Sequence, residues 1–181
     1  MTEKSLDSQL QDLTCLYELT RELASSFVLS DCLKEAMNLL SEIKDMENGT
    51  VTIVNPLTGK LEIEVAHGLT AEGRRRGKYK IGEGITGRVV SSGEPIIVPH
   101  IADEPLFLNR TRSRGDINDQ NRSFLCVPIK DGKRVIGALS VDRISEGGLD
   151  NQANKDLQFL TVLSTIIAQT VKRIQIVSEE K

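Results

Sequence analysis

The apolar positions of the chain recur first with a helical spacing, then with the spacing of strands, and at the end with a helical spacing again. From residue 5 to 27 they return every three or four positions, which is typical of an amphipathic helix. The stripe consists of Leu6, Leu10, Leu13, Tyr17, Thr20, Ala24 and Phe27. A second helix is predicted through Ile43, and Ser30 or Asp31 is expected to cap its first turn.

Beyond residue 50 the apolar positions alternate with a period of two, which predicts strands. The predicted strands are residues 51–54, 61–65, 79–81, 95–101, 124–129 and 134–142. Asp131 and Gly132 suit a type I′ turn, so the last two strands are expected to form a hairpin. A closing helix is predicted from Asp150 almost to the end of the chain. Together these elements predict an α+β fold with a central antiparallel sheet.

The segment GEGITG at residues 82–87 fits the pattern G-x-G-x-x-G of dinucleotide-binding loops. Such a loop needs a long helix that opens at its last glycine and an apolar strand before it. Here the predicted helix runs only from Ile85 to Val90, because Gly93 and Pro95 end it. The sequence therefore favours a tight turn into a short helix over a cofactor loop.

Composition narrows the function classes. The 181 residues carry a net charge of −3, which argues against a dedicated nucleic-acid-binding protein. The three cysteines, Cys15, Cys32 and Cys126, are widely spaced and form no CxxC motif, a pattern typical of a reducing cytoplasm. The polar amino terminus predicts no signal peptide, and no apolar run was expected to reach membrane-spanning length.

The motifs of several enzyme classes are absent from the sequence. It contains no GxxxxGK[ST] loop, no GxSxG elbow and no HExxH motif. His67 and His100 lie on different segments, so a zinc site would need carboxylates from scattered positions. No cysteine has a neighbouring base or cation that would activate its thiol. The sequence therefore predicts no metal site, no cofactor and no enzyme.

Two basic stretches are candidate anion sites. Residues 74–76 are three consecutive arginines in a glycine-flanked loop, a pattern that favours a solvated turn. Arg110, Arg112 and Arg114 recur at every second position of the polar segment 102–122. The planar guanidinium of arginine suits a clamp for carboxylate or phosphate, while simple solvation is the alternative.

Three segments together resemble a GAF domain. They are residues 82–111 (GEGITGRVVSSGEPIIVPHIADEPLFLNRT), 123–130 (SFLCVPIK) and 134–143 (RVIGALSVDR). More narrowly, they look like the sensory domain of Nif-specific, sigma-54-dependent transcription activators, over about residues 30–177. The resemblance implies a GAF-like antiparallel sheet of five to six strands flanked by helices. It also implies that the GEGITG glycines turn the chain beside a small-molecule pocket.

The resemblance also implies a set of ligand-binding residues. Those expected at the pocket are Ile81, Ile85, Thr86, Phe107 and Leu108. The cyclic-nucleotide-binding relatives have an aromatic–acid pair where this chain reads Val65-Ala66-His67, and a Phe-Asp-Glu signature that does not follow Asp142-Arg143 here. Among nitrogen-fixation activators the metabolite is 2-oxoglutarate, and Arg110 and Arg112 are the expected partners of its carboxylates.

The terminal helices carry more apolar surface than one core face requires, which predicts a homodimer. The expected contacts are Leu10, Tyr17, Leu163, Ile167 and Ile174; a single broad core face is the alternative. Residues 1–29 are then a dimerisation helix, 30–149 the GAF core, and 150–181 a helix leading to a following domain.

The resemblance implies a cytoplasmic regulatory domain that senses a small molecule and controls an attached AAA+ ATPase, with no direct contact to nucleic acid or membrane. Two alternatives remain open at this stage. One is a GAF domain that binds no ligand and serves as a dimerisation and protein-interaction module. The other is a GAF-fold sulfoxide reductase, although the working cysteines of that enzyme lie near the pocket and two cysteines of this chain lie in the amino-terminal helices.

Overall fold

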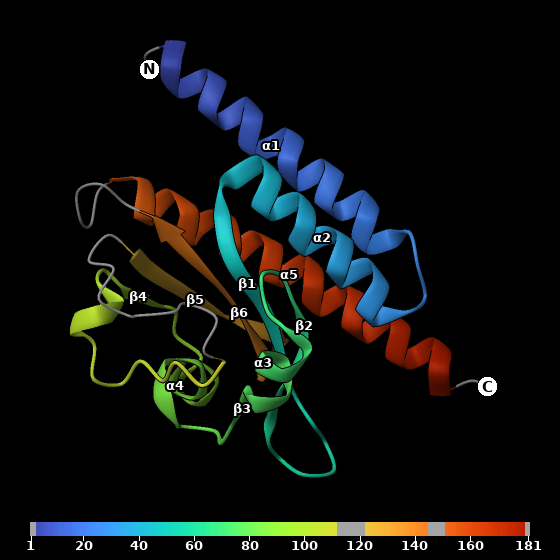
Figure 1. Ribbon diagram of the computed structural model, residues 1–181. Coiled ribbons are helices and arrows are strands. Elements are labelled where there is room, and N and C mark those ends of the chain that lie inside the picture. The colour runs from blue at the N-terminus through green and yellow to red at the C-terminus, as the bar shows by residue number, and fades with distance from the viewer. Residues whose placement is uncertain (1–2, 112–121, 145–150, 180–181) are drawn as a thin grey trace.

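The computed structural model describes residues 3–111, 122–144 and 151–179, which form a six-stranded antiparallel sheet between unequal layers (Figure 1). The helices are α1 (Glu3–Ala24), α2 (Leu29–Lys44), α3 (Ala71–Arg76), α4 (Gly84–Ser92), the 3-10 turn η1 (Ile101–Asp103) and α5 (Asn151–Glu179). The strands are β1 (Met46–Val54), β2 (Leu61–Ala66), β3 (Lys78–Tyr79), β4 (Ile96–Val98), β5 (Arg122–Asp131) and β6 (Arg134–Ile144). Their order across the sheet is β3-β2-β1-β6-β5-β4.

Every strand pair of this sheet is antiparallel, which confirms the predicted fold class. The predicted hairpin joins β5 to β6, but its turn differs from the prediction. Asp131 pairs with Arg134, so the loop is Gly132-Lys133, and only Gly132 has a positive φ (59°), whereas the predicted type I′ turn at Asp131-Gly132 needs two such residues. In the dinucleotide-binding alternative, a parallel crossover would start at the GEGITG segment, whereas α4 has only nine residues and leads to the antiparallel edge strand β4.

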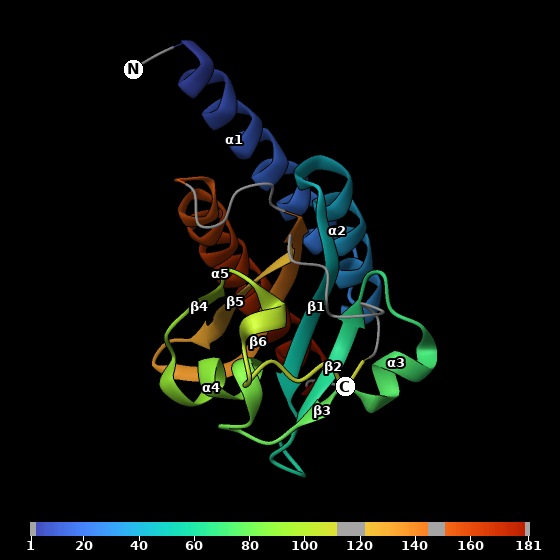
Figure 2. The same cartoon turned by 60° about the vertical axis from the view of Figure 1, so that its left-hand side comes forward.

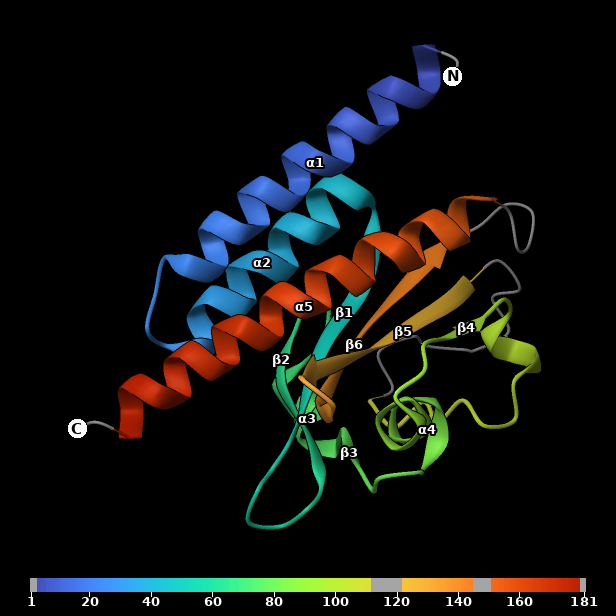
Figure 3. The ribbon, with the colours of Figure 1, turned by 180° about the vertical axis from the view of Figure 1, so that it is seen from behind.

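The helices α1, α2 and α5 cover one face of the sheet, as Figure 3 shows from that side. Helix α5 packs on β5 and β6, α2 packs on β1 and β2, and α1 packs against α2 and α5, so that buried leucines of all three helices join one apolar core. The main contributions are Leu19, Leu23, Leu33, Leu40, Leu160 and Leu163 from the helices and Leu125, Val127, Leu139 and Val141 from the strands. This layer forms the larger of two apolar cores. In all three views α1 runs past the end of α2 (Figures 1–3).

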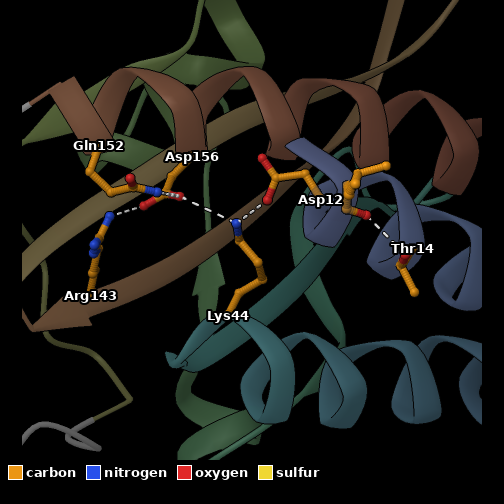
Figure 4. A network of polar contacts seen from close by, with 7 residues as sticks. Asp12, Thr14, Lys44, Arg143, Gln152 and Asp156 are labelled. Carbon is orange, nitrogen blue, oxygen red and sulfur yellow. Dashed lines mark hydrogen bonds and ion pairs between the residues drawn. The ribbon is translucent and has the colours of Figure 1, made fainter. Parts of the chain in front are cut away.

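A network of charged side chains ties the helical layer to β6 (Figure 4). Asp156 of α5 pairs with Arg143 of β6 and accepts a 3.0 Å hydrogen bond from the amide nitrogen of Gln152. Lys44, at the end of α2, lies 2.5 Å from Asp12 of α1 and 3.9 Å from Asp156. The side chain of Asp156 is only 3% exposed, so these partners replace its lost hydration.

The opposite face of the sheet carries the second, smaller core. Figure 2 shows α4 and the chain around η1 on this side. Its buried residues are Leu61, Ile85, Val89, Val90, Val98, Ile101, Phe124, Cys126 and Ala138. Alternate residues of β5 and β6 face the two cores, as the period of two requires.

Three local predictions differ from the structure. Helix α2 begins at Leu29 after Val28 as its cap, so Ser30 and Asp31 lie in its first turn and do not cap it. Strand β1 begins at Met46, five residues before the predicted start, because a bulge at Asn48 interrupts the alternation. Residues 74–76, predicted to lie in a loop, form the second half of α3.

Helix α5 also differs from the sequence-based expectation. Residues 152–178 are long and apolar enough, by length and composition, to cross a membrane, although no such run was predicted. Its large residues Phe159, Leu160, Leu163, Ile167 and Val171 are fully or almost fully buried against the sheet and the other helices, as is Ala168. In all, 39% of the most apolar window of α5 is buried within the fold.

Candidate functional site

A small cavity lies between the sheet and the segment that follows η1. Its floor is formed by Thr50 and Thr52 of β1, Ser140 of β6, Ile63 of β2 and Phe124 of β5. Its walls and roof are formed by Leu69, Tyr79, Ile85, Thr86, Phe107, Leu108 and Thr111. The space open to the centre of a water-sized sphere is about 30 Å³, which holds about two waters. In this form the cavity is nearly closed.

Hydroxyl groups from the two central strands line the cavity floor. Thr50 and Ser140 are paired neighbours on β1 and β6, and their hydroxyl oxygens lie 2.6 Å apart. One step along the sheet, the amide of Asn48 donates a 2.8 Å hydrogen bond to the carboxylate of Asp142, which is fully buried. The floor therefore presents neutral hydrogen-bonding groups to a ligand in the middle of an apolar core.

The glycines of GEGITG place α4 and the roof in close contact. A Cβ on Gly87 would lie 2.4 Å from the carbonyl oxygen of Lys80, so only glycine fits at this position. Gly84 has a φ of 62°, and a Cβ there would lie 3.0 Å from the Leu108 side chain. The glycines thus allow the close approach of Leu108 and the tight turn into a short helix that the sequence favoured.

Two arginines contact the outer side of residues 107–111, which follow η1 and are called the roof segment below. Arg76 of α3 donates hydrogen bonds to the carbonyl oxygens of Arg110 (3.3 Å) and Thr111 (3.0 Å). The guanidinium of Arg110 pairs with Glu83, donates to the carbonyl of Lys78, and lies 5.2 Å from the centre of the Tyr79 ring. A backbone N–H from Lys80 and the Arg110 hydrogen bond lower the pKa of Glu83. Inside, the Phe107 ring meets Phe124 edge to face at 5.1 Å.

The arrangement of sheet, short helix and covered cavity matches a known domain family. The GAF domain model of that family matches residues 28–171. The chain belongs to the GAF domain family.

Relatives of this GAF domain include regulators of nitrogen fixation. The chain is 39% identical to the Nif-specific regulatory protein of Azospirillum brasilense over 94% of the chain and 27% of that protein. It is 38% identical to the nitrogen fixation protein VnfA of Azotobacter vinelandii over 88% of the chain and 30% of that protein. The chain thus spans less than a third of the length of these curated relatives.

Solved structures share the fold of this GAF domain. The GAF domain of A. aeolicus nlh2 in an inactive state superposes with a TM-score of 0.78 at 22% identity, covering 91% of this chain and 97% of that one. A free methionine-R-sulfoxide reductase from Neisseria meningitidis, in complex with its substrate, superposes with a TM-score of 0.72 at 18% identity, covering 90% and 89%. At these identities the likeness concerns the fold alone.

The structure brings together four of the seven predicted ligand-binding residues. Ile85, Thr86, Phe107 and Leu108 line the cavity of the GAF domain. Arg110 lies on the outer side of the roof, where Glu83 and the Lys78 carbonyl occupy its guanidinium.

Ile81 does not line the cavity: its side chain is 50% exposed, because the chain turns at Gly82 before α4 begins. Arg112 lies outside the described residues, as does Arg114. Sequence reasoning missed the hydroxyl floor of Thr50, Thr52 and Ser140. The signal that could have found it is the polar residue at alternate positions of these otherwise apolar strands.

The predicted dimer residues differ in their exposure. Leu10 and Tyr17 are 54% and 65% exposed on α1, as a contact surface requires. Leu163 and Ile167 are fully buried in the helical core, so within the protomer they cover the sheet and are not available to a partner. Ile174 is half-buried near the end of α5. Helical spacing identified an apolar stripe on α5 but assigned it to the wrong neighbour.

The three thiols of this GAF domain are all buried. Burial raises the pKa of Cys15 to about 11 and that of Cys126 to about 12, with a hydrogen bond from Thr86 opposing the shift at Cys126. Burial also raises the pKa of Cys32. Since the thiolate is the nucleophile, these groups are poorly suited to thiol catalysis at neutral pH. Among the described residues, no three His, Cys, Asp or Glu side chains are grouped to bind a metal.

Proposed function

We propose that this GAF domain is the sensory part of a bacterial transcriptional regulator, with its small-molecule site at the hydroxyl-floored cavity. The observation that carries the proposal is the cavity itself: it joins hydroxyls of two central strands to a roof that side-chain contacts hold in place. The similarity to nitrogen-fixation regulators supports a regulatory role. A sensor that controls an attached AAA+ ATPase in a sigma-54-dependent activator fits the greater length of these relatives.

The size of the cavity sets a condition on ligand binding. About 30 Å³ is too small for a metabolite, whose sites usually measure several hundred Å³. A ligand therefore has to displace the roof around Phe107 and Leu108. We infer that the roof moves outward when the site fills, which transmits occupancy to Arg76, Arg110 and the segment that they hold. A dicarboxylate such as 2-oxoglutarate would engage Arg110 during this movement.

The experiment is a thermal-shift and calorimetric titration of the isolated domain with 2-oxoglutarate, cyclic nucleotides and glutamine. A ligand that binds only the folded state raises the melting temperature in proportion to its concentration over Kd. Thr52→Val removes one floor hydroxyl and should weaken binding by about 1 kcal/mol, whereas Thr165→Val, on the exposed side of α5, is the matched control. If no compound of the panel raises the melting temperature, the proposal that the domain senses a small molecule is wrong.

We further infer that a second copy of the chain packs against α1. Leu6, Leu10, Leu13 and Tyr17 follow a 4-3-4 spacing on this helix and are all about half exposed or more. Such a stripe favours a parallel or antiparallel helix pair with heptad-like contacts. Light scattering at tens of micromolar tests this inference, and a monomer at that concentration would contradict it.

Two other functions are favoured by single observations. The nearly closed cavity favours a ligand-free GAF domain that acts by dimerisation and protein contact. The fold shared with a methionine sulfoxide reductase favours that activity, but the raised thiol pKa values of Cys15 and Cys126 weigh against it. A reductase assay together with thiol titration of the native protein separates the enzyme from the binding modules.

A further inference from the structure

An open groove lies on the outer side of the roof segment, next to the closed cavity. It is lined by Arg75, Arg76, Lys78, Leu108, Asn109 and Arg110, with no carboxylate among its lining residues. The groove has a volume of about 620 Å³, compared with about 30 Å³ for the cavity. Four cationic side chains from α3, β3 and the roof therefore converge on one solvent-open space.

The ion pairs of these cations are weak or exchangeable. Lys78 lies 3.6 Å from Glu62, and both side chains are exposed by more than a third. Arg76 pairs with Glu72, whose side chain is 72% exposed. Solvent-exposed pairs of this kind contribute at most about 1 kcal/mol, so a ligand anion can replace the carboxylate at little cost.

Two side chains of the groove have polar groups without a partner in the described part of the chain. Arg75 is exposed, and the structure gives its guanidinium no hydrogen bond or ion pair. The side-chain oxygen of Asn109 is buried and has no hydrogen-bond partner among the described residues. A buried polar atom without a partner is rare in a native fold, so a bound hydroxyl or amide donor would satisfy it.

Leu108 separates the groove from the closed cavity. Its side chain lines both spaces and rests over Gly84, where a Cβ would come within 3.0 Å of it. Leu108 is therefore the residue that the two spaces share. The inner space offers neutral hydroxyls and the outer space offers cations, so the combined site suits a molecule with one neutral polar end and one anionic end.

We propose that the groove lined by Arg75, Lys78 and Arg110 is an outer oxyanion subsite, which holds the carboxylate or phosphate of a small metabolite while Leu108 moves aside to admit the neutral remainder to the hydroxyl floor. The proposal rests on the sensor function proposed above. In the empty form Glu83 occupies Arg110 as an internal competitor. Displacement of this carboxylate by the ligand would release the contact between α4 and the roof.

The experiment titrates the full chain with inorganic phosphate, succinate and the uncharged succinamide, with amide chemical shifts as the readout. Phosphate and succinate are expected to bind and to shift the resonances of Leu108 and Asn109, whereas succinamide should bind at least tenfold more weakly. The two anions distinguish a phosphate from a carboxylate preference. The double variant Arg75→Ala/Lys78→Ala should weaken anion binding by about 10- to 100-fold. Arg134→Ala, an exposed arginine outside the groove, is the control and should change it less than twofold.

A gain-of-binding variant provides an independent measurement. Glu83→Gln keeps an oxygen for the Lys80 N–H, which Glu83 accepts at 2.8 Å, but loses the charge that competes for Arg110. Phosphate should bind this variant several-fold more tightly than the parent. Equal weakening by Arg134→Ala, or weaker binding to Glu83→Gln, would overturn the subsite. Equal binding of succinate and succinamide would overturn it while leaving the sensor function intact, whereas no binding by any metabolite of the wider panel would contradict the sensor function itself.

Discussion

The buried carboxylate of Asp156 provides the sharpest test of how the helical layer is held to the sheet. Its side chain is 3% exposed and has three partners: Arg143, Gln152 and, at 3.9 Å, Lys44 (Figure 4). The change Asp156→Asn preserves its shape and removes its charge. Arg143 and Lys44 would then keep their charges in surroundings where they are 26% and 10% exposed.

The expected loss follows from these contacts. Breaking a buried ion pair from one side costs about 3–5 kcal/mol of unfolding free energy. Two features reduce this figure, because Lys44 keeps Asp12 at 2.5 Å and Arg143 is partly hydrated. We therefore expect Asp156→Asn to lower the free energy of unfolding by about 2–3 kcal/mol at pH 7.

The matched control is Asp131→Asn. Asp131 pairs with Lys172 at 2.9 Å, but the side chains are 38% and 58% exposed. Exposed pairs contribute about 0–1 kcal/mol and are screened by salt. Urea unfolding followed by circular dichroism, at one protein concentration and in reductant, measures both variants. If the two losses agree within about 0.5 kcal/mol, or if high salt abolishes both equally, the network does not stabilise the fold in the way argued here.

Three further outcomes follow from the described geometry. Tyr17→Asp should convert the proposed dimer to a folded monomer, as measured by light scattering. Ile167→Asp should instead unfold the protomer, since Ile167 is fully buried. If the Tyr17→Asp variant is folded and still dimeric, α1 does not form the interface. Gly87→Ala should cost about 3 kcal/mol in urea unfolding, because its Cβ would meet a backbone oxygen at 2.4 Å. Gly59→Ala, strained in its backbone but with open space, should cost about 1 kcal/mol, and equal losses would contradict the close approach. Since burial raises the pKa of Cys126 from 9.0 to about 12, its ionisation favours the unfolded chain: its contribution to stability is fully present below pH 9 and is lost by about 1.4 kcal/mol per pH unit from there to about pH 12. Cys126→Ala should make this alkaline decline shallower, and an unchanged slope would refute the assignment.

The regular elements were predictable because burial on one side imposes a period on the sequence. The strands of the β5–β6 hairpin and the helical stripes follow from this rule. The start of β1 could not be found in the same way, because Asn48 and the adjoining glycine disfavour strands and a bulge shifts the register. Side-chain spacing also cannot predict what an apolar stripe packs against. It identified the stripe through Leu163 and Ile167, but only the tertiary structure shows that this stripe is buried within the protomer.

The candidate site was predictable only in part, for a similar reason. Ile85, Thr86, Phe107 and Leu108 came from the resemblance, not from spacing. The strap from Arg76 to the carbonyl of Thr111 joins positions 35 residues apart, and no local pattern records such a contact. Three consecutive arginines were interpreted as a solvated turn, yet Arg74 and Arg76 both donate to backbone carbonyls of other segments.

Successive residues of β6 face the helical core and the cavity in turn, which sets the distance between the cavity and the helices. Leu139 faces the helical core, and Ser140, the next residue, lines the cavity. In the proposed sensor, the ligand contact and the contact to the helical layer are therefore carried by consecutive residues of one strand, on opposite sides of a single layer of backbone. A small shift of β6 would reach α5 through one ion pair, Arg143 to Asp156. The loops on the cavity side can then diverge to accept new molecules while the helical side keeps the same mechanical output.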